Sequence, residues 1–169
     1  MRNLLVVIVC LFLSACGFHL SGDAKLPTQM QKTAITSKIK YSPLTRELAQ
    51  SIKSTGTQVV DDPSEANTII QFIAINESNN LATSGTTQET RKYTLTSSAT
   101  LQVADKKGGV IYGPFTLSES ASQYLYAGQV ISNSEESVAI YRGLRRELVR
   151  KIMFKLSSQE LKTALVAQN

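Results

Sequence analysis

Histidine, cysteine and tryptophan are scarce in this 169-residue chain, which has one histidine, two cysteines and no tryptophan. His19 lies three residues after Cys16, where a nucleophile–base pair inside a folded cleft is not expected. A zinc site needs several histidine, cysteine or carboxylate ligands at set spacings. The sequence therefore predicts no enzyme and no metal site, and nothing in it indicates a cofactor.

A glycine-rich phosphate loop is also missing. Gly108-Gly109 lies between two predicted strands, with no helix directly after it. We interpret Asp61-Asp62 as a solvated turn and not as a pair of catalytic carboxylates. Beyond the N-terminal apolar run, no stretch is long enough to cross a membrane as a helix.

The N-terminus has the pattern of a bacterial export signal. Arg2 precedes an apolar run over residues 4–13, which is followed by Ser14, Ala15 and Cys16. The Leu-Ser-Ala-Cys junction resembles a lipobox, which predicts cleavage before Cys16 and lipidation of its thiol. An ordinary signal peptide with a chance cysteine is the alternative. By resemblance to enterobacterial lipoproteins, Gly17 predicts delivery to the outer membrane.

Two consequences follow from this leader. Multiple acyl chains on Cys16 would make release from a membrane negligible, since each buried methylene adds about 0.8 kcal/mol. Cys10 would leave with the leader, so no disulfide is expected despite the oxidising compartment.

The formal charge of +5 is concentrated in one segment. Residues 141–162 contain seven basic and two acidic side chains, which gives this segment alone a net charge of +5. Such local basicity, together with the export signal, argues against nucleic acid as a partner. It favours an acidic protein surface or a phosphate-bearing lipid.

The first half of the mature chain predicts a strand, a helix and a second strand. Residues 33–39 read as a short strand, and Ser42-Pro43 opens a helix with Ser42 as its cap. Leu44, Leu48 and Ile52 form its apolar stripe, and Gly56 ends it. Residues 68–75 are apolar on both faces and predict a central strand. We expect a turn or a short helix start at residues 61–64.

The second half predicts a strand pair and a long helix. Residues 76–87 are polar and read as a long hairpin or a mobile tip. Residues 93–103 alternate between an apolar side, which Ser97 interrupts, and a polar side that is rich in hydroxyl groups. A turn at residues 105–109 leads to a strand over 110–117, where Gly113-Pro114 suggests a bulge or an edge position, and residues 118–126 could continue it.

A capping box at Ser132 and Glu135 opens the last helix. The apolar positions expected to face the core are Val138, Tyr141, Leu144, Leu148, Ile152 and Leu156. Gly143 suggests close packing, and fraying is expected after Ser157.

These elements predict an α+β fold, a two-layer sandwich in which two helices pack on one face of a mixed four-stranded sheet. The strand–helix–strand order implies parallel pairing of the first two strands. We divide the chain into a signal peptide (1–15), an anchor segment (16–31), one α+β domain (32–157) and a tail (158–169).

Cys16-Gly17-Phe18-His19-Leu20 and the order of elements resemble the LptE family of lipopolysaccharide-assembly lipoproteins. The resemblance covers nearly the whole mature chain. It implies a non-enzymatic outer-membrane protein that binds lipopolysaccharide. It also implies that the protein sits as a plug and assembly partner in an LptD-like β-barrel, so that lipopolysaccharide reaches the outer leaflet.

The basic ligand residues of that family lie near sheet-end loops. Arg91, Lys92, Lys106 and Lys107 occupy such positions here and are the candidate lipopolysaccharide-binding residues, because Arg and Lys form charge-assisted bonds with phosphate. Where the family would place a lysine before the last helix, this chain has Gly128-Gln129. For each basic pair taken alone, a purely solvating role is the alternative.

The row Arg142, Arg146 and Arg150 indicates a solvated helix face or contact with an acidic partner. The alternative function for the whole chain is a free periplasm-facing carrier or chaperone for lipid or lipoprotein, which predicts an apolar cavity between helices and sheet. A plug predicts a filled core and a polar outer surface.

Overall fold

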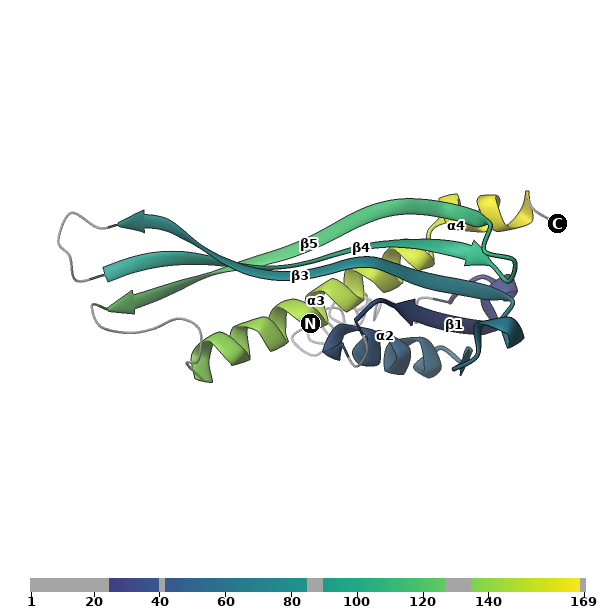
Figure 1. Ribbon diagram of the computed structural model, residues 1–169, viewed down its shortest axis with the longest axis horizontal. Coiled ribbons are helices and arrows are strands. Elements are labelled where there is room, and N and C mark those ends of the chain that lie inside the picture. The colour runs from purple at the N-terminus through teal and green to yellow at the C-terminus, as the bar shows by residue number, and fades with distance from the viewer. Residues whose placement is uncertain (1–24, 40–41, 85–89, 127–134, 168–169) are drawn as a thin grey trace, which may run out of the picture.

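A computed structural model of the chain describes residues 25–39, 42–84, 90–126 and 135–167. A five-stranded mixed sheet has the order β2-β1-β3-β4-β5, and the helices pack against it (Figure 1). The predicted leader, the lipidation of Cys16 and the cap at Ser132 lie outside these residues. The α+β class is confirmed, but the sheet has five strands where we predicted four.

The first half of the fold is a parallel unit. After the short 3-10 helix η1 (Thr28–Met30), β1 (Lys32–Ser37) pairs in parallel with both β2 (Gln58–Val60) and β3 (Thr68–Ser84). The predicted parallel pairing of the two main strands is confirmed. β2 is the additional strand; its three residues are too few to show a period, and only pairing with β1 identifies it.

The second half is an antiparallel meander of three long strands. β3 continues past the predicted apolar stretch, pairs with β4 (Thr90–Asp105), and β4 pairs with β5 (Val110–Tyr126). The hairpin interpretation is therefore right for residues 76–84, while residues 85–89 lie outside the described chain. The predicted continuation of the last strand to residue 126 is confirmed. Gly113-Pro114 lies on the edge strand beside a shift in register, as expected.

Helix α2 (Pro43–Ser54) begins with Pro43 and buries the predicted stripe of Leu44, Leu48 and Ile52. Gly56 follows it with a φ of +85°, a conformation that favours glycine. The predicted side-chain cap is wrong, since the Ser42 hydroxyl makes no capping bond. Instead, Ser42 is buried and its carbonyl oxygen accepts a hydrogen bond from the Thr45 hydroxyl at 2.8 Å.

Helix α3 (Glu135–Leu156) buries four of the six predicted positions, from Leu144 to Leu156. Val138 is 49% exposed, and Ser137 is buried in its place, donating to Gln123 Oε1 at 2.8 Å. The first turn therefore meets a polar part of the sheet. Gly143 faces open space, so the expected close packing is wrong.

Residues after Ser157 do not fray as predicted but form helix α4 (Gln159–Val166), which brings the described helices to three instead of two. Ser158 caps this helix by accepting a hydrogen bond from the Leu161 N–H. Leu161 and Leu165 are buried in the main core. Two apolar residues four apart anchor the short helix.

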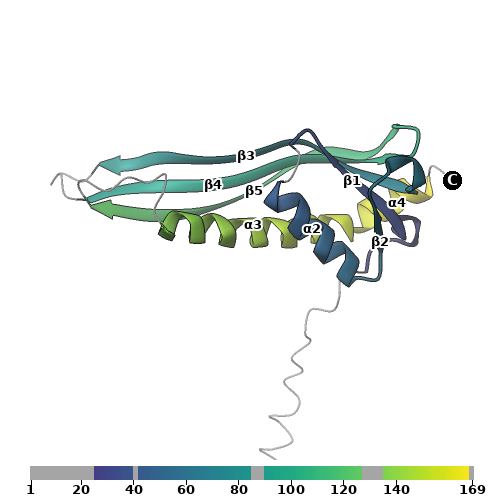
Figure 2. The ribbon, with the colours of Figure 1, turned by 60° about the horizontal axis from the view of Figure 1, so that its bottom comes forward.

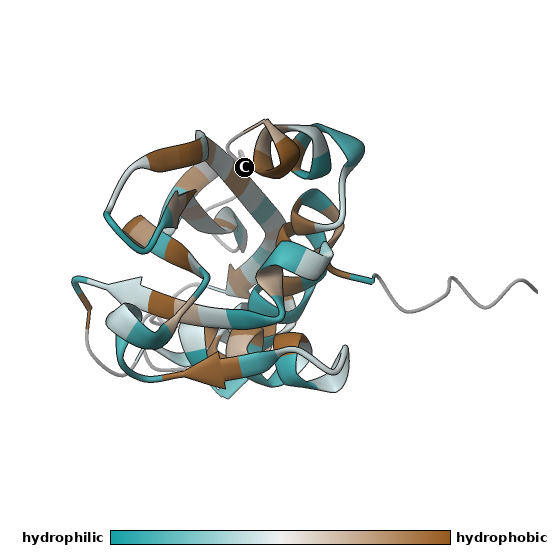
Figure 3. Cartoon of the chain, turned by 90° about the vertical axis from the view of Figure 1, so that its right-hand side faces the viewer, coloured by the Kyte–Doolittle hydropathy of each residue, from teal (hydrophilic) through white to brown (hydrophobic). Residues whose placement is uncertain are grey.

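One apolar core fills the space between the helices and the sheet. Its central residues come from both layers and include Leu48, Ile70, Leu101, Leu148 and Ile152. Figure 3 shows hydrophobic residues alternating with hydrophilic ones along the strands and helices.

Among the described residues, the smaller of two clusters of buried apolar side chains lies on the opposite face of the sheet and consists of Ala34, Ala66 and Ile69. It lies near the short 3-10 helix η2 (Pro63–Glu65), where a turn or helix start was predicted. The rest of that face is rich in hydroxyl groups, and Thr100 and Thr116 are hydrogen-bonded across it at 2.8 Å.

Candidate binding surfaces on the sheet

The four basic candidates lie at opposite ends of β4. Arg91 and Lys92 are near its start, whereas Lys106 and Lys107 follow its end. With about 3.4 Å per residue, the two pairs are on the order of 50 Å apart. The structure therefore keeps the two basic pairs apart, and one headgroup cannot contact all four side chains.

Arg91 and Lys92 lie where β3, β4 and β5 extend beyond the first turn of α3 (Figure 1). Lys92 pairs with Tyr124 in the sheet register, and its Nζ lies 5.9 Å from the centroid of that ring. Arg91 pairs with Leu125, which is buried. Since successive side chains point to opposite faces, Arg91 lies on the helix-covered side and Lys92 on the hydroxyl-rich side.

Exposed apolar side chains accompany these two cations. We define the tip surface as Leu81, Arg91, Lys92, Tyr124 and Tyr126; the tyrosines are 59% and 68% exposed, and Leu81 is 52% exposed. Cations beside aromatic rings suit an amphiphile with an anionic headgroup. The sequence analysis missed the tyrosines, although their alternation with Gln123 and Leu125 on an edge strand was a usable signal.

Lys106 and Lys107 belong to a tight turn between β4 and β5. The Asp105 carboxylate accepts hydrogen bonds from the Lys107 and Gly109 N–H groups, both at 2.8 Å. Gly108 has a φ of +86°. Both lysine side chains are exposed, which fits the solvating alternative.

Two basic residues of α3 have structural partners on the sheet. Arg145 forms an ion pair with Glu77 of β3 at 2.8 Å, and Lys151 forms one with Glu119 of β5 at 2.6 Å. Ser97 of β4 is in register with both glutamates. Ion pairs thus hold α3 to both flanks of the meander.

Ser97 explains the break that we noted in the apolar side of β4. Its side chain is fully buried, and its hydroxyl has no hydrogen-bond partner within the described chain. Nearby, burial and then the charge of Glu77 raise the pKa of Tyr141. Ser97 and Glu77 on the sheet and Tyr141 on α3 therefore form a polar part of the interface between helix and sheet.

The outer row of α3 is exposed at Arg142, Arg146 and Arg150. Arg150 forms an ion pair with Glu147, one turn earlier. Exposed pairs of this kind contribute little to stability. The exposure of these three arginines fits the solvated helix face, one of the two alternatives that the sequence offered.

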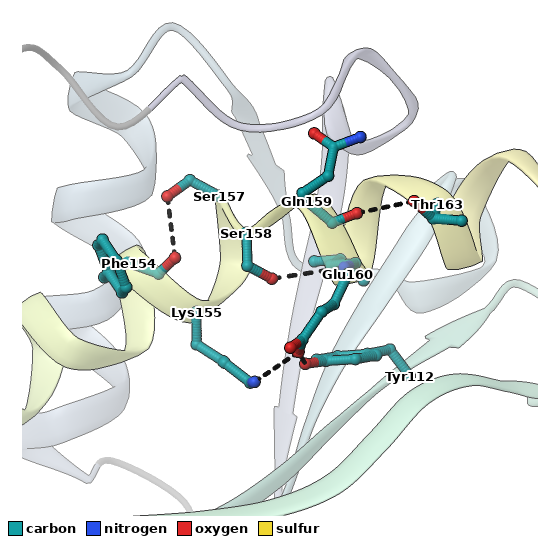
Figure 4. Close-up of polar contacts among 9 residues, drawn as sticks. Tyr112, Phe154, Lys155, Ser157, Ser158, Gln159, Glu160 and Thr163 are labelled. Carbon is teal, nitrogen blue, oxygen red and sulfur yellow. Dashed lines mark hydrogen bonds and ion pairs between the residues drawn. The ribbon is translucent and has the colours of Figure 1, made fainter.

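A polar cluster joins α3, α4 and β5 (Figure 4). Glu160 Oε2 accepts hydrogen bonds from Lys155 Nζ at 2.7 Å and from the Tyr112 hydroxyl at 2.5 Å. The bond from Lys155 and then the bond from Tyr112 lower the pKa of Glu160. The interactions of Lys155 with Glu160 and then with Tyr112 raise the pKa of Lys155. Lys155 Nζ also lies 5.4 Å from the centroid of the Tyr112 ring.

Within the described ranges, no group of three or more histidine, cysteine or carboxylate side chains is positioned to hold a metal ion. None of the helices in those ranges combines the length and apolarity needed to cross a membrane.

The chain matches a family of lipopolysaccharide-assembly proteins. The model of the LptE family, described as lipopolysaccharide-assembly, matches residues 30–156. The LPS-assembly lipoprotein LptE of Photorhabdus laumondii is 24% identical over 154 residues, covering 91% of this chain and 84% of that protein. The protein of the same name from Pectobacterium atrosepticum is 24% identical over 168 residues, covering 96% and 90%.

A solved structure has the same fold. The solution structure of lipoprotein B from Nitrosomonas europaea superposes with a TM-score of 0.69 at 17% identity. The match covers 83% of this chain and 90% of that protein. At this identity, the likeness concerns the fold alone.

Proposed function

Because the chain belongs to the LptE family of lipopolysaccharide-assembly lipoproteins, we propose that it is the plug and assembly partner of an LptD-like β-barrel. The family is associated with the outer membrane and is not a family of enzymes. In the proposed role, the protein helps the barrel to fold and to deliver lipopolysaccharide to the outer leaflet. The observation that carries the proposal is the family match over residues 30–156, which include all five strands and helices α2 and α3.

The packing of the domain supports a plug more than a carrier. Large side chains such as Leu48, Leu101 and Ile152 are fully buried between the helices and the sheet. Three grooves lined by described residues, beside Phe72, Leu44 and Phe154, are open at the surface. The hydroxyl-rich sheet face suits a polar barrel interior.

We propose the tip surface as the place where lipopolysaccharide binds. Lipid A and core phosphates are anionic, and Arg91 and Lys92 supply charge-assisted hydrogen bonds at an end of the sheet that also exposes tyrosines. Lys106 and Lys107 would contact a different molecule or solvent, because they lie at the other end of β4.

We further propose that Cys16 is lipidated and holds the protein at the outer membrane, as its lipobox-like sequence predicts. The domain would then lie on the periplasmic side and within the barrel. Full extension from Cys16 to Lys25 allows the first described residue to lie at most about 30 Å from the anchor.

The test is a mild-detergent pull-down of the tagged full-length protein from outer membranes, followed by mass spectrometry. We expect one large β-barrel protein at a 1:1 ratio. Recovery of lipid without a barrel would instead support the carrier. A Cys16→Ala variant is the matched control for the anchor, since it leaves the domain intact and removes the lipidated thiol.

Depletion in cells gives a second readout. The proposal predicts immature barrel protein and less lipopolysaccharide on the cell surface. Unchanged barrel maturation together with unchanged surface lipopolysaccharide would overturn it.

A further inference from the structure

The outward side of the helix layer is basic. Figure 2 shows α2 and α3 on the same side of the sheet, where both bury apolar stripes in the main core. Their exposed sides carry cations, and we define the helix surface as Arg46 and Lys53 of α2 with Arg142, Arg146 and Arg150 of α3. The acidic residues within these two stretches are Glu47 and Glu147, so the surface has a net positive charge.

Most cations of the helix surface are available to a partner. Arg150 pairs with Glu147, whereas the other four cations form no ion pair with any residue that the structure describes. By contrast, Arg145 and Lys151 of α3 reach the sheet and pair with carboxylates there. The cations directed at the sheet are neutralised, and the positive charge remains on the outward side.

The arginine row of α3 ends in an exposed aromatic side chain. Phe154 is the next position after Arg150 at the same spacing, and it is 77% exposed. An apolar groove of about 450 Å³ lies beside it, with Leu117 and Lys151 in its lining. Cations next to exposed apolar groups suit the interface of a bilayer, where phosphates lie beside acyl chains. An acidic protein surface would match the cations alone.

The chain enters the domain on the side that carries this surface. Leu26 packs against the main core and Met30 is buried in it, so the first described residues lie on the helix-covered side of the sheet. A lipidated Cys16 lies at most about 30 Å from Lys25. Since α3 with its 22 residues is about 33 Å long, the helix surface can reach the membrane that holds such an anchor. The tether also keeps lipid headgroups at a high local concentration.

We propose that the helix surface docks on anionic phospholipid headgroups of the membrane that holds the anchor. The arginine and lysine side chains form charge-assisted bonds with the phosphates, and Phe154 enters the headgroup region. The hydroxyl-rich face of the sheet then points away from the membrane. This orientation belongs to the lipoprotein outside a barrel and so goes beyond the plug role, although it rests on the proposed lipidation of Cys16.

The experiment reconstitutes the lipidated full-length protein in vesicles of phosphatidylcholine, with or without phosphatidylglycerol, whose headgroups carry a quencher. A fluorophore is attached at Gln50→Cys or Gly143→Cys, because Gln50 is exposed on α2 and a side chain at Gly143 meets open space. Ser120→Cys, exposed on the hydroxyl-rich face, is the control. Since Cys10 is expected to leave with the leader and Cys16 to be acylated, the introduced thiol is the one that is labelled.

Docking predicts strong quenching of both helix probes in the vesicles with phosphatidylglycerol and weak quenching in phosphatidylcholine alone. The probe at Ser120 should be quenched weakly in both. Salt at about 1 M should release the domain, because the screening length falls to about 3 Å. Helix probes quenched equally in the two kinds of vesicle, or no more than the probe at Ser120, would overturn the proposal.

Charge reversal tests the cations. Arg142→Glu with Arg146→Glu should lower the ratio of docked to undocked domain about tenfold or more, because each cation near an anionic surface adds to binding. Lys106→Glu with Lys107→Glu is the matched control, which changes the net charge equally at an exposed turn. All four residues are exposed, so both variants should keep the melting temperature of wild type. Equal losses of docking would overturn the helix surface as the site.

A further substitution tests the apolar contact. Phe154→Ala should lower the same ratio about threefold or more, since burying a phenylalanine removes apolar area from water. Val110→Ala is the control, because Val110 is 47% exposed at the start of β5. An effect of Phe154→Ala no larger than that of the control would overturn insertion of the aromatic ring.

This inference and the proposed function fail separately. The vesicles contain neither a barrel nor lipopolysaccharide, so absent docking refutes only the helix surface. A pull-down without a barrel refutes only the plug. The mass of the purified protein shows whether Cys16 carries acyl chains, and an unmodified Cys16 would refute the anchor together with this inference.

Discussion

Adjacent residues on a strand face opposite sides of a sheet, and this limits what each basic side chain at the tip surface can do. Lys92 stacks near Tyr124 on the hydroxyl-rich face, whereas Arg91 lies on the face that carries the helices. A ligand that contacts both must wrap around the end of the sheet. A large headgroup with several phosphates has the necessary reach.

Reversing both charges, Arg91→Asp with Lys92→Asp, should weaken lipopolysaccharide binding by about tenfold or more, since a hydrogen bond to a charged group contributes about 1.5–3 kcal/mol. Isothermal titration of the purified protein with lipopolysaccharide measures this. The matched control is Lys106→Asp with Lys107→Asp, which changes the charge equally at the other end of β4. Equal losses would indicate only general attraction to anions.

Glu160 should make stability depend on acid pH. The bonds from Lys155 and Tyr112 lower the pKa of this carboxyl below its ordinary value of 4.5 in the folded state. A carboxyl of this kind stabilises the fold above 4.5, and the contribution is lost as the pH falls through the folded pKa. The raised pKa of Lys155 keeps that group charged throughout the acid range.

We therefore compare urea unfolding at about pH 6 and about pH 3.5. The free energy of unfolding should fall less between these two pH values for Glu160→Gln than for wild type. The difference is expected to be small, because the cluster is exposed to solvent. Glu65→Gln is the control, since Glu65 forms an exposed ion pair with Lys32 on another part of the fold. Identical pH dependence of wild type and Glu160→Gln would contradict the assignment.

At the scale of the element, α4 is an integral part of the core. Leu161 is fully buried and Leu165 nearly so, whereas Val166 on the same helix is 63% exposed. Leu161→Ala should lower the free energy of unfolding by about 2–5 kcal/mol. Val166→Ala should change it by no more than about 0.5 kcal/mol. Equilibrium urea unfolding measures both changes. Equally small effects of the two substitutions would show that α4 does not contribute to the core and that this segment is a frayed tail.

At the scale of the whole molecule, the sheet has a buried end and a projecting end. Residues 76–80 of β3 are exposed, while Ile70 and Phe72 of the same strand are buried under the helices. Few buried contacts allow local opening at low free energy. We expect the amides of residues 78–81 and 93–95 to exchange with solvent faster than those of residues 69–72 and 101–103.

Hydrogen exchange monitored by mass spectrometry checks this gradient along the strands. Adding lipopolysaccharide should slow exchange at the projecting end if the tip surface binds it. Uniform protection along β3 and β4 would show that the projecting end is as stable as the core, and it would contradict the gradient.

The sequence by itself determined the elements that carry their own periodicity. The stripe of Leu44, Leu48 and Ile52 and the alternation in β4 each report burial on one face, because a helix and a strand repeat at different periods. The strand–helix–strand order also specified the parallel pairing of β1 with β3. The lipobox-like motif and the family resemblance needed no structure.

Only the tertiary structure decided the features that depend on distant neighbours. β2 has three residues and is a strand because β1 lies beside it, and α4 is stable because Leu161 and Leu165 reach the core. Ser137 replaces Val138 at the interface because Gln123 lies opposite. The length of β4 separates the two basic pairs, and the order of strands leaves β5 at the edge. Periodicity reports which face of an element is buried, whereas pairing, register and separation are properties of the whole chain.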